Sequence, residues 1–177
     1  MSELDEAWDL ALAEAQQRAA RAGRRDVAEY LRLRASNDLL RKTAIEWLFE
    51  TFTILAGQAN RRGASIQIAK EEMHRFPVGN ATMVGPLLTL GFGVRALLIE
   101  AGWPRTPKDG FVRGGGLACA RIRHRGKKSV DEDLMLVRSA KDAPRWMVID
   151  QKTDRQSALS EGGIQKHLAK MLAEDYR

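Results

Sequence analysis

The spacing of apolar residues changes once along this chain, near Gly63, and that change limits the fold more than any other feature. Before Gly63, apolar residues recur at helical spacing, as in an amphipathic α-helix. After it, short apolar runs are separated by glycine, asparagine and proline, which is typical of strands joined by turns. The sequence therefore predicts an α+β fold, with helices first and a sheet after them.

The second of two N-terminal helices is expected to be long. It should begin at Asp26, a good N-cap residue, and could reach residue 60, with Gly63 just past its end. A break near residues 36–37 is an alternative to one continuous helix. Its buried, sheet-facing stripe should include Trp47, Leu48, Phe52 and Leu55, which recur at helical spacing.

Two shorter helices should flank the rest of the fold. The first should span residues 2–22, because Ser2 resembles a capping residue and Gly23 a stop signal. The last should span residues 162–175, with its apolar side facing inward.

Short runs after Gly63 predict strands at residues 65–69, 82–90, 94–100, 117–124, 134–138 and 146–149, although residues 94–100 would also make a short helix. The connections are short, which suits antiparallel hairpins and not parallel crossovers. We expect a curved antiparallel sheet of about five to six strands packed against the long helix, since each has one apolar face to bury. A chain of 177 residues fits a single domain, residues 1–177.

Residue counts exclude some classes of protein. Cys119 is the only cysteine, so an intramolecular disulfide and a cysteine-rich metal site are excluded, and a buried hydrophobic role is favoured for it. The acidic N-terminus lacks the basic and apolar regions of a signal peptide, and no apolar run approaches the roughly 18 residues of a membrane span. We expect a cytoplasmic protein with no membrane segment.

The positive charge is concentrated in residues 101–130. This segment holds eight basic residues and one acidic residue, a local charge of +7, whereas the whole chain carries +6. Within it, Arg121, Arg123, Arg125, Lys127 and Lys128 are candidate nucleic-acid-binding residues. The three arginines alternate along an expected strand and would share one face, where they could meet phosphates. The alternative is an exposed sheet face neutralised by Glu100 or by the acids at 131–133.

Residues 102–116 form the least regular segment of the sequence. They combine prolines, which limit flexibility, with glycines, which allow a partner to approach the backbone closely. Its candidate ligand-binding residues are Trp103, Arg105, Phe111 and Arg113, which could stack on or bind an anionic ligand. The alternative is an irregular surface loop whose aromatic side chains pack back onto the core.

The sequence contains no catalytic signature, and we expect no cofactor and no bound metal. The segment Gly91-Phe92-Gly93-Val94-Arg95-Ala96 matches a dinucleotide-binding pattern, but it lies in an expected hairpin and is better explained as a turn. Three histidines, His74, His124 and His167, lack the spacing of a metal site.

The leading hypothesis is a non-enzymatic binding module for a polyanion such as nucleic acid, through residues 101–130. The alternative is a small-molecule or peptide binder that uses the concave sheet face, with residues 102–116 as a lid. An enzyme without a visible motif, and an interaction role through a homodimer, are further hypotheses.

Overall fold

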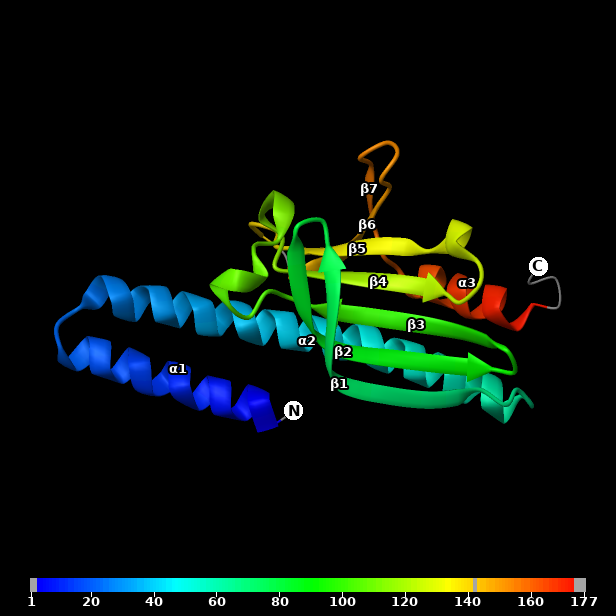
Figure 1. The fold of residues 1–177 in the computed structure, drawn as a ribbon, viewed down its shortest axis with the longest axis horizontal. Helices are drawn as coiled ribbons and strands as arrows, with labels where there is room; N and C mark the ends of the chain where they lie inside the picture. Colours follow the sequence, from blue (N-terminus) through cyan, green and yellow to red (C-terminus); the bar gives the residue numbers. More distant parts are fainter. Residues whose placement is uncertain (1–2, 142, 174–177) are drawn as a thin grey trace. The chain divides into compact units, whose positions relative to one another are not determined.

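The computed structural model describes residues 3–141 and 143–173, and within them two helices precede a seven-stranded sheet and a third helix (Figure 1). The helices are α1 (Glu3–Arg21), α2 (Arg25–Arg61) and α3 (Glu161–Leu172). The strands are β1 (Gln67–Val78), β2 (Ala81–Phe92), β3 (Arg95–Gly102), β4 (Ala118–His124), β5 (Glu132–Val137), β6 (Arg145–Ile149) and β7 (Gln156–Ala158). The predicted α+β class and order of elements are confirmed.

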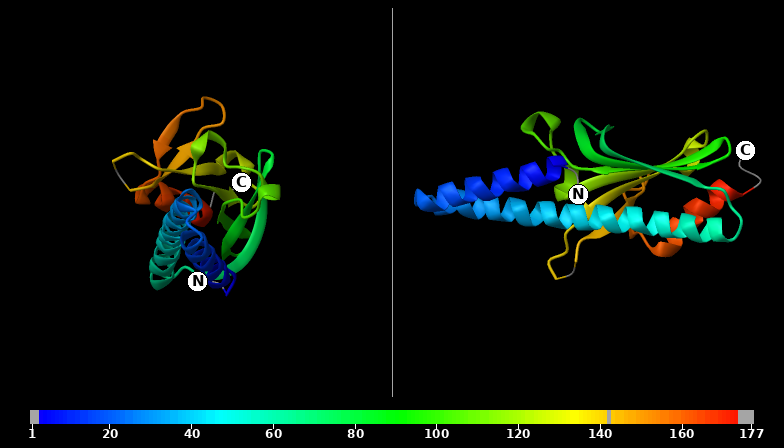
Figure 2. Two further views of the ribbon diagram at one scale, coloured as in Figure 1. Left: turned by 90° about the vertical axis from the view of Figure 1, so that its left-hand side faces the viewer. Right: turned by 90° about the horizontal axis from the view of Figure 1, so that it is seen from below.

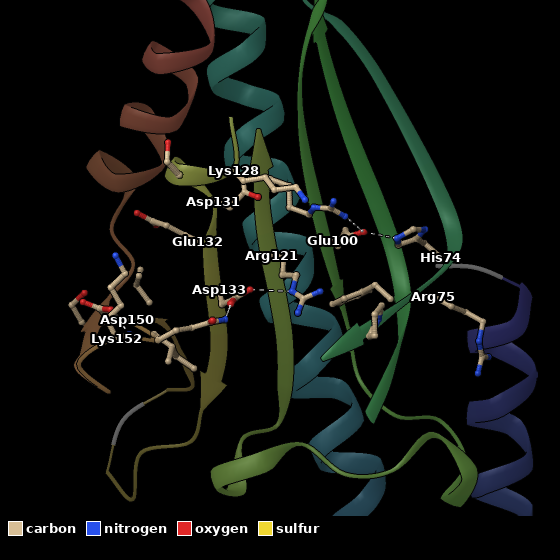
Figure 3. Close-up of a pocket in the computed structure, with 18 residues that line it drawn as sticks. His74, Arg75, Glu100, Arg121, Lys128, Asp131, Glu132, Asp133, Asp150 and Lys152 are labelled. Carbon is tan, nitrogen blue, oxygen red and sulfur yellow. Dashed lines mark hydrogen bonds and ion pairs between the residues drawn. The ribbon is translucent and has the colours of Figure 1, made fainter. Parts of the chain in front are cut away.

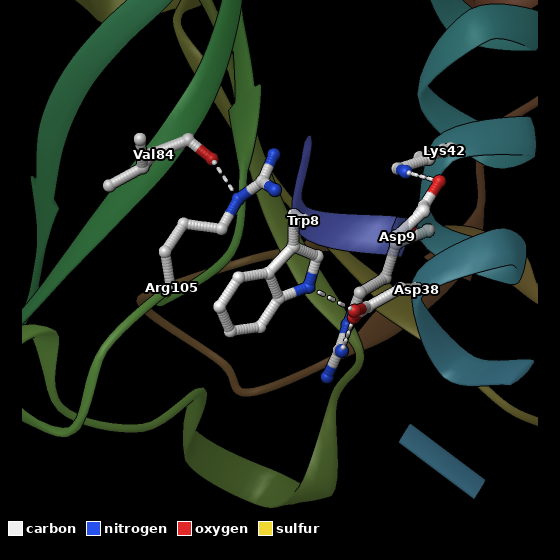
Figure 4. A network of polar contacts seen from close by, with 7 residues as sticks. Trp8, Asp9, Asp38, Lys42, Val84 and Arg105 are labelled. Carbon is white, nitrogen blue, oxygen red and sulfur yellow. Dashed lines mark hydrogen bonds and ion pairs between the residues drawn. The ribbon is translucent and has the colours of Figure 1, made fainter. Parts of the chain in front are cut away.

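The chain divides into two compact units, residues 1–42 and residues 43–177, with the boundary inside α2. The single domain expected from the sequence stays a prediction. In the first unit, polar contacts join α1 to the start of α2 (Figure 4). Trp8 Nε1 donates to Oδ2 of the buried Asp38 at 3.0 Å, and Lys42 Nζ donates to Oδ2 of Asp9 at 2.8 Å. The bond to Asp38 offsets part of the cost of burying its charge.

The helix ends differ in detail from the predictions. Asp26 lies in the first turn of α2 and not at its N-cap, where its charge still suits the positive end of the helix dipole. No break occurs at residues 36–37. Ser160 caps α3, because its side chain accepts a hydrogen bond from the Gly163 amide at 3.1 Å. Two predicted helix ends, Ser2 and Asp175, lie outside the described residues.

The segment of α2 from residue 43 onward packs against the sheet. As predicted, Leu48, Phe52 and Leu55 are buried, and Phe52 has 0% exposure. The predicted burial of Trp47 is wrong, since this side chain is 45% exposed. The buried stripe consists of Ile45, Leu48, Phe49, Phe52, Leu55 and Ala56. Because each residue rotates by about 100° around a helix, a position next to this stripe can face away from the core.

The strands follow one another in sequence order, and each is antiparallel to its neighbours. Residues 94–100, for which a short helix was the alternative, lie mainly in a strand, β3. The prediction was wrong in two places: β1 extends to Val78, well past residue 69, and β7 is a further strand. β7 has three residues with no apolar alternation, so only its pairing with β6 defines it.

The segment of α2 from residue 43 onward and the helix α3 cover one face of the sheet (Figure 2). Register pairs Ile99 with Ile122 on this face, and both side chains are buried. On the same face, Trp146 Nε1 donates to the carbonyl oxygen of Ala44 in α2 at 2.9 Å. The buried residues of α3 are Ile164, His167, Leu168 and Met171. This face holds the hydrophobic core of residues 43–177. Within the described residues of this unit, no α-helix covers the other face of the sheet (Figure 2).

The free end of the β1–β2 hairpin turns across this open face (Figure 1). A register shift between Glu71 and His74 gives β1 an extra residue, a β-bulge that bends the strand. β2 then passes so close to β3 that a Cβ on Gly85 would lie 2.1 Å from the Ala101 carbonyl oxygen, which only glycine avoids. Beyond this crossing, a second small core forms from Phe76, Ala81, Met83 and Cys119. The turned hairpin therefore rises as a wall beside the middle of the sheet.

Candidate functional site

A groove of about 1280 Å³ lies on the open face of the sheet, within residues 43–177 (Figure 3). Its floor holds Glu100 of β3, Arg121 of β4 and Asp133 of β5. Residues 74–77 of the turned hairpin line one side, and residues 148–152 of β6 and the following turn line the other. The rest of the lining comes from Arg123 of β4, from Ser157 of β7, and from the connection between β4 and β5 with the start of β5, namely Lys128, Ser129, Asp131 and Glu132.

Three charged residues form one row across the groove floor. Register pairs Glu100 directly with Arg121, and Arg121 with Asp133. Opposite charges in such positions commonly pair, and Arg121 Nε donates to Oδ1 of Asp133 at 3.0 Å. Among the described residues, Arg121 and Glu100 form no ion pair, although they are neighbours in the row. Arg121 is therefore engaged on the β5 side only.

Glu100 is the most deeply placed charge in the groove, with a side chain only 4% exposed. Its Oε1 lies 2.8 Å from Nε2 of His74, which the β1 bulge turns toward the groove, and 3.6 Å from Nη1 of Arg123. Its other oxygen, Oε2, is buried and has no hydrogen-bond partner among the described residues. A buried acceptor left without a donor costs free energy, so this oxygen is an unsatisfied acceptor in the groove floor.

The groove lining balances positive and negative charge. Its bases are Arg75, Arg121, Arg123, Lys128 and Lys152. Its acids are Glu100, Asp131, Asp133 and Asp150, together with Glu132, whose carboxylate contacts His167 on the helix-covered side. Pro77, which is exposed, and Ile149, which is paired with Asp133, add apolar surface. The groove therefore offers hydrogen-bond donors, acceptors and apolar surface together, which is the mixture found in sites for small molecules.

Two of the three arginines predicted to bind nucleic acid, Arg121 and Arg123, line this groove. Arg121 pairs with Asp133, and Arg123 lies within ion-pair distance of Glu100. These are two of the acids that the sequence offered as internal partners. Phosphate binding by Arg121 and Arg123 stays a prediction, and it would compete with these contacts.

The other three predicted basic residues follow the end of β4. Lys128 is exposed and lines the groove, whereas Arg125 and Lys127 do not line it. Arg125 is exposed and Lys127 is partly buried in the connection to β5. The five basic residues are therefore divided between the groove and the adjoining turn.

Residues 102–116 are more regular than expected. They contain two short 3-10 helices, η1 (Pro107–Asp109) and η2 (Arg113–Gly115). The buried Asp109 accepts a hydrogen bond from the Thr106 amide at 2.9 Å and another from Arg75 Nη2 at 2.6 Å. The Thr106 amide, together with its hydroxyl, lowers the pKa of Asp109 below its usual range. These contacts hold the segment against β1.

None of the four residues predicted to bind a ligand lines the groove. Trp103 is buried, and the Arg105 guanidinium stacks 3.6 Å from the centroid of its ring. Phe111 is 83% exposed, and Arg113 is exposed as well. No residue from 102–116 lines the groove. A lid role for this segment therefore stays a prediction.

Two histidines lie on the helix-covered side of the sheet. His124 and His167 are buried, and Nε2 of His124 lies 2.9 Å from Nδ1 of His167. His167 Nε2 in turn lies 3.0 Å from Oε2 of Glu132. Burial, reinforced by the nearby charges of His167 and Lys170, lowers the pKa of His124 to about 4. The packing of α3 onto the sheet encloses His167.

Two other sequence features have structural explanations. Cys119 is buried as predicted, and burial raises the pKa of its thiol to about 11. The glycine-rich segment at residues 91–96 forms the turn between β2 and β3, with Gly93 at a φ of 60°. Within the described residues, no group of three or more His, Cys, Asp or Glu side chains could hold a metal ion.

Sequence reasoning missed the central position of Glu100. It treated this residue only as a counter-charge, although a lone acid in the apolar run Leu97-Leu98-Ile99-Glu100-Ala101 is itself a signal of a buried charge. The role of His74 could not be foreseen, because a bulge sets its direction.

No family model, curated protein or solved structure matches this chain. Among the described residues, no helix is both long enough and apolar enough to cross a membrane.

Proposed function

We propose that residues 43–177 form a non-enzymatic binding module for a small polar molecule or a short peptide. The groove on the open sheet face carries this proposal. With about 1280 Å³ it exceeds the roughly 300–1,000 Å³ of typical small-molecule sites, so it has room for a peptide of a few residues. We propose binding without catalysis because the sequence contains no catalytic motif.

The charges of the groove support a small ligand over a polymer. Five basic and five acidic residues line it, so a long polyanion would meet repulsion as well as attraction. A small molecule can place donors and acceptors individually on such a surface. This proposal keeps the ligand class of the second sequence hypothesis but moves its site away from residues 102–116.

The test is to map ligand binding by backbone amide chemical shifts in isotope-labelled protein. The panel would contain free amino acids, short peptides, dicarboxylates and mononucleotides. Binders should perturb amides of β3, β4 and β5 around Glu100, Arg121 and Asp133. Filling the groove with S129W should abolish binding, because Ser129 is an exposed lining residue.

The matched control is S139W, since Ser139 is exposed and does not line the groove. It should bind like the unmodified protein. The groove would be rejected as the binding site if ligands perturbed amides only outside it, or if they bound S129W and S139W equally well.

A polyanion such as nucleic acid is a second candidate. The observation that favours it is the exposure of Arg123, Arg125 and Lys128 at one end of β4. Three phosphate contacts would give a log–log salt dependence of about −3 on duplex DNA. Affinity measured across a salt series, with Arg125→Glu and Lys128→Glu, tests it: a flat salt dependence, or no binding at low salt, excludes this surface.

A further inference from the structure

We propose that the groove recognises a protonated primary amine, which donates to the Oε2 oxygen of Glu100. This inference rests on the proposed function and names the chemical group that the ligand presents. Free amino acids, simple amines and the N-terminus of a peptide share this chemistry.

The burial of Glu100 is the first support. Its side chain is 4% exposed, and Oε2 has no donor among the described residues. Burying a carboxylate is unfavourable unless both oxygens are hydrogen-bonded. A cationic donor from a ligand would supply the missing bond, and in this partly dehydrated position a charge-assisted bond is strong.

The partners of Glu100 favour an ammonium group over other cations. Oε1 already faces Nε2 of His74 at 2.8 Å and Nη1 of Arg123 at 3.6 Å. A guanidinium prefers to bind both oxygens of a carboxylate as a planar fork, and only one oxygen is open here. An ammonium is compact and needs a single acceptor, so it matches the position better.

Arg121 indicates which chemical group of the ligand would lie next to the amine. It is the direct cross-strand neighbour of Glu100, and its hydrogen bond to Asp133 uses Nε. Figure 3 shows its guanidinium group directed into the groove, where the terminal nitrogens can donate to a carboxylate or a carbonyl oxygen of the ligand. A molecule with an amine beside a carboxylate or amide, as in an amino acid or a peptide N-terminus, would use both residues.

The test uses the full chain and four probes with the same side chain: L-leucine, 3-methylbutylamine, N-acetyl-L-leucine and the tripeptide Leu-Gly-Gly. The branched side chain suits the apolar lining at Pro77 and Ile149. Dissociation constants would be measured by calorimetry or amide shifts. We expect the three amine-bearing probes to bind at least tenfold more tightly than the acetylated one, since a charged hydrogen bond contributes about one to two powers of ten.

The four probes also distinguish the sources of the amine. Tighter binding of leucine than of 3-methylbutylamine would indicate a free amino acid, with its carboxylate at Arg121. Tighter binding of Leu-Gly-Gly would indicate a peptide N-terminus. Either result supports the amine at Glu100.

The variant E100Q keeps the shape of the side chain and removes its charge. It should weaken the binding of all three amine-bearing probes roughly ten- to hundredfold and leave the binding of N-acetyl-L-leucine unchanged. The matched control is E50Q, since Glu50 is exposed on α2 and is not part of the groove. If E100Q does not fold, the acetylation comparison in the unmodified chain decides the question alone.

Three results would overturn the inference: equal binding of the acetylated probe and leucine, unchanged amine binding by folded E100Q, or no amine binding at millimolar concentrations. In each case the proposed function would still stand if another ligand in the panel bound the unmodified protein and S139W but not S129W. The two proposals can therefore fail separately.

Discussion

The helix-covered face and the open face of the sheet receive alternate residues of the same strands, yet their chemistry differs. The covered face presents Ile99 and Ile122 as a buried pair, and the open face presents Glu100 and Arg121 one residue away on each strand. Burial of apolar surface stabilises the first face by roughly 25 cal/mol per Å². Partly exposed charges on the second contribute little to folding.

We therefore expect the helix-covered face to determine stability and the open face to determine binding. Substitutions under the helices should unfold the protein, whereas substitutions in the groove should alter binding with small effects on stability. Glu100 is an intermediate case. It is as buried as a core residue, but it lines the groove.

The largest effect is expected under the helices. Phe52→Ala should lower the free energy of unfolding by about 3–5 kcal/mol, the usual range for a buried aromatic residue. Phe111→Ala is the matched control and should change it by no more than about 0.5 kcal/mol, because Phe111 is 83% exposed. Chemical denaturation measures both, and similar losses in the two variants would contradict the assignment of the core.

The second prediction concerns acid conditions on the covered face. Burial lowers the pKa of His124 to about 4, against about 6.5 in the unfolded chain. Between these values the unfolded state binds a proton that the folded state does not, so stability is full above pH 6.5 and falls as the pH drops to about 4. The loss should be roughly 3 kcal/mol.

The groups around His124 set this behaviour. His167 and Lys170 of α3, and Lys127, lower its pKa, whereas Glu132 of β5 raises it. His124→Gln removes the titrating group and should flatten the loss of stability between pH 6.5 and pH 4. An equal slope in this variant and the unmodified protein would show that other groups cause the loss.

The third prediction concerns the β1–β2 hairpin, which lines one side of the groove. Gly85→Ala would place a Cβ 2.1 Å from the Ala101 carbonyl oxygen, so the strands must move apart, at a cost of about 1–3 kcal/mol. Gly91→Ala is the control, because its Cβ would lie an ordinary 3.8 Å from Gln67 Cβ. Thermal unfolding of both variants, together with amide shifts near His74, would show whether the wall of the groove depends on this crossing.

The smallest effect is expected on the groove floor. A double-mutant cycle on Arg121 and Asp133, using Arg121→Gln and Asp133→Asn, should give a coupling energy of about 1 kcal/mol or less, since both side chains are partly exposed. The coupling should decrease with added salt. A coupling of several kcal/mol would mean that the open face is itself a structural core, and the contrast between the two faces would be lost.

Local patterns in the sequence were sufficient for the helices and for most of the strands. The helical period through Leu48, Phe52 and Leu55 and the glycine turns between strands depend on neighbours close in sequence, and both predictions are confirmed. Such patterns define an apolar stripe only to within about one residue, which is why Trp47 was wrongly placed in the core. β7 was missed because its pairing with β6, and not its own three residues, makes it a strand.

The candidate site depended on tertiary structure. The sequence indicated that Arg121 and Arg123 would share a face, because alternation along a strand is a local property. It could not assign their partners, since Glu100 and Asp133 come from other strands and only the sheet register brings them together. His74 reaches Glu100 because a bulge bends β1, and the histidine pair is buried because α3 packs on the sheet. The sequence by itself thus determined the helices, most of the strands and the alternation of charge, whereas register, bulge and helix packing decided which charges are buried, paired or open to a ligand.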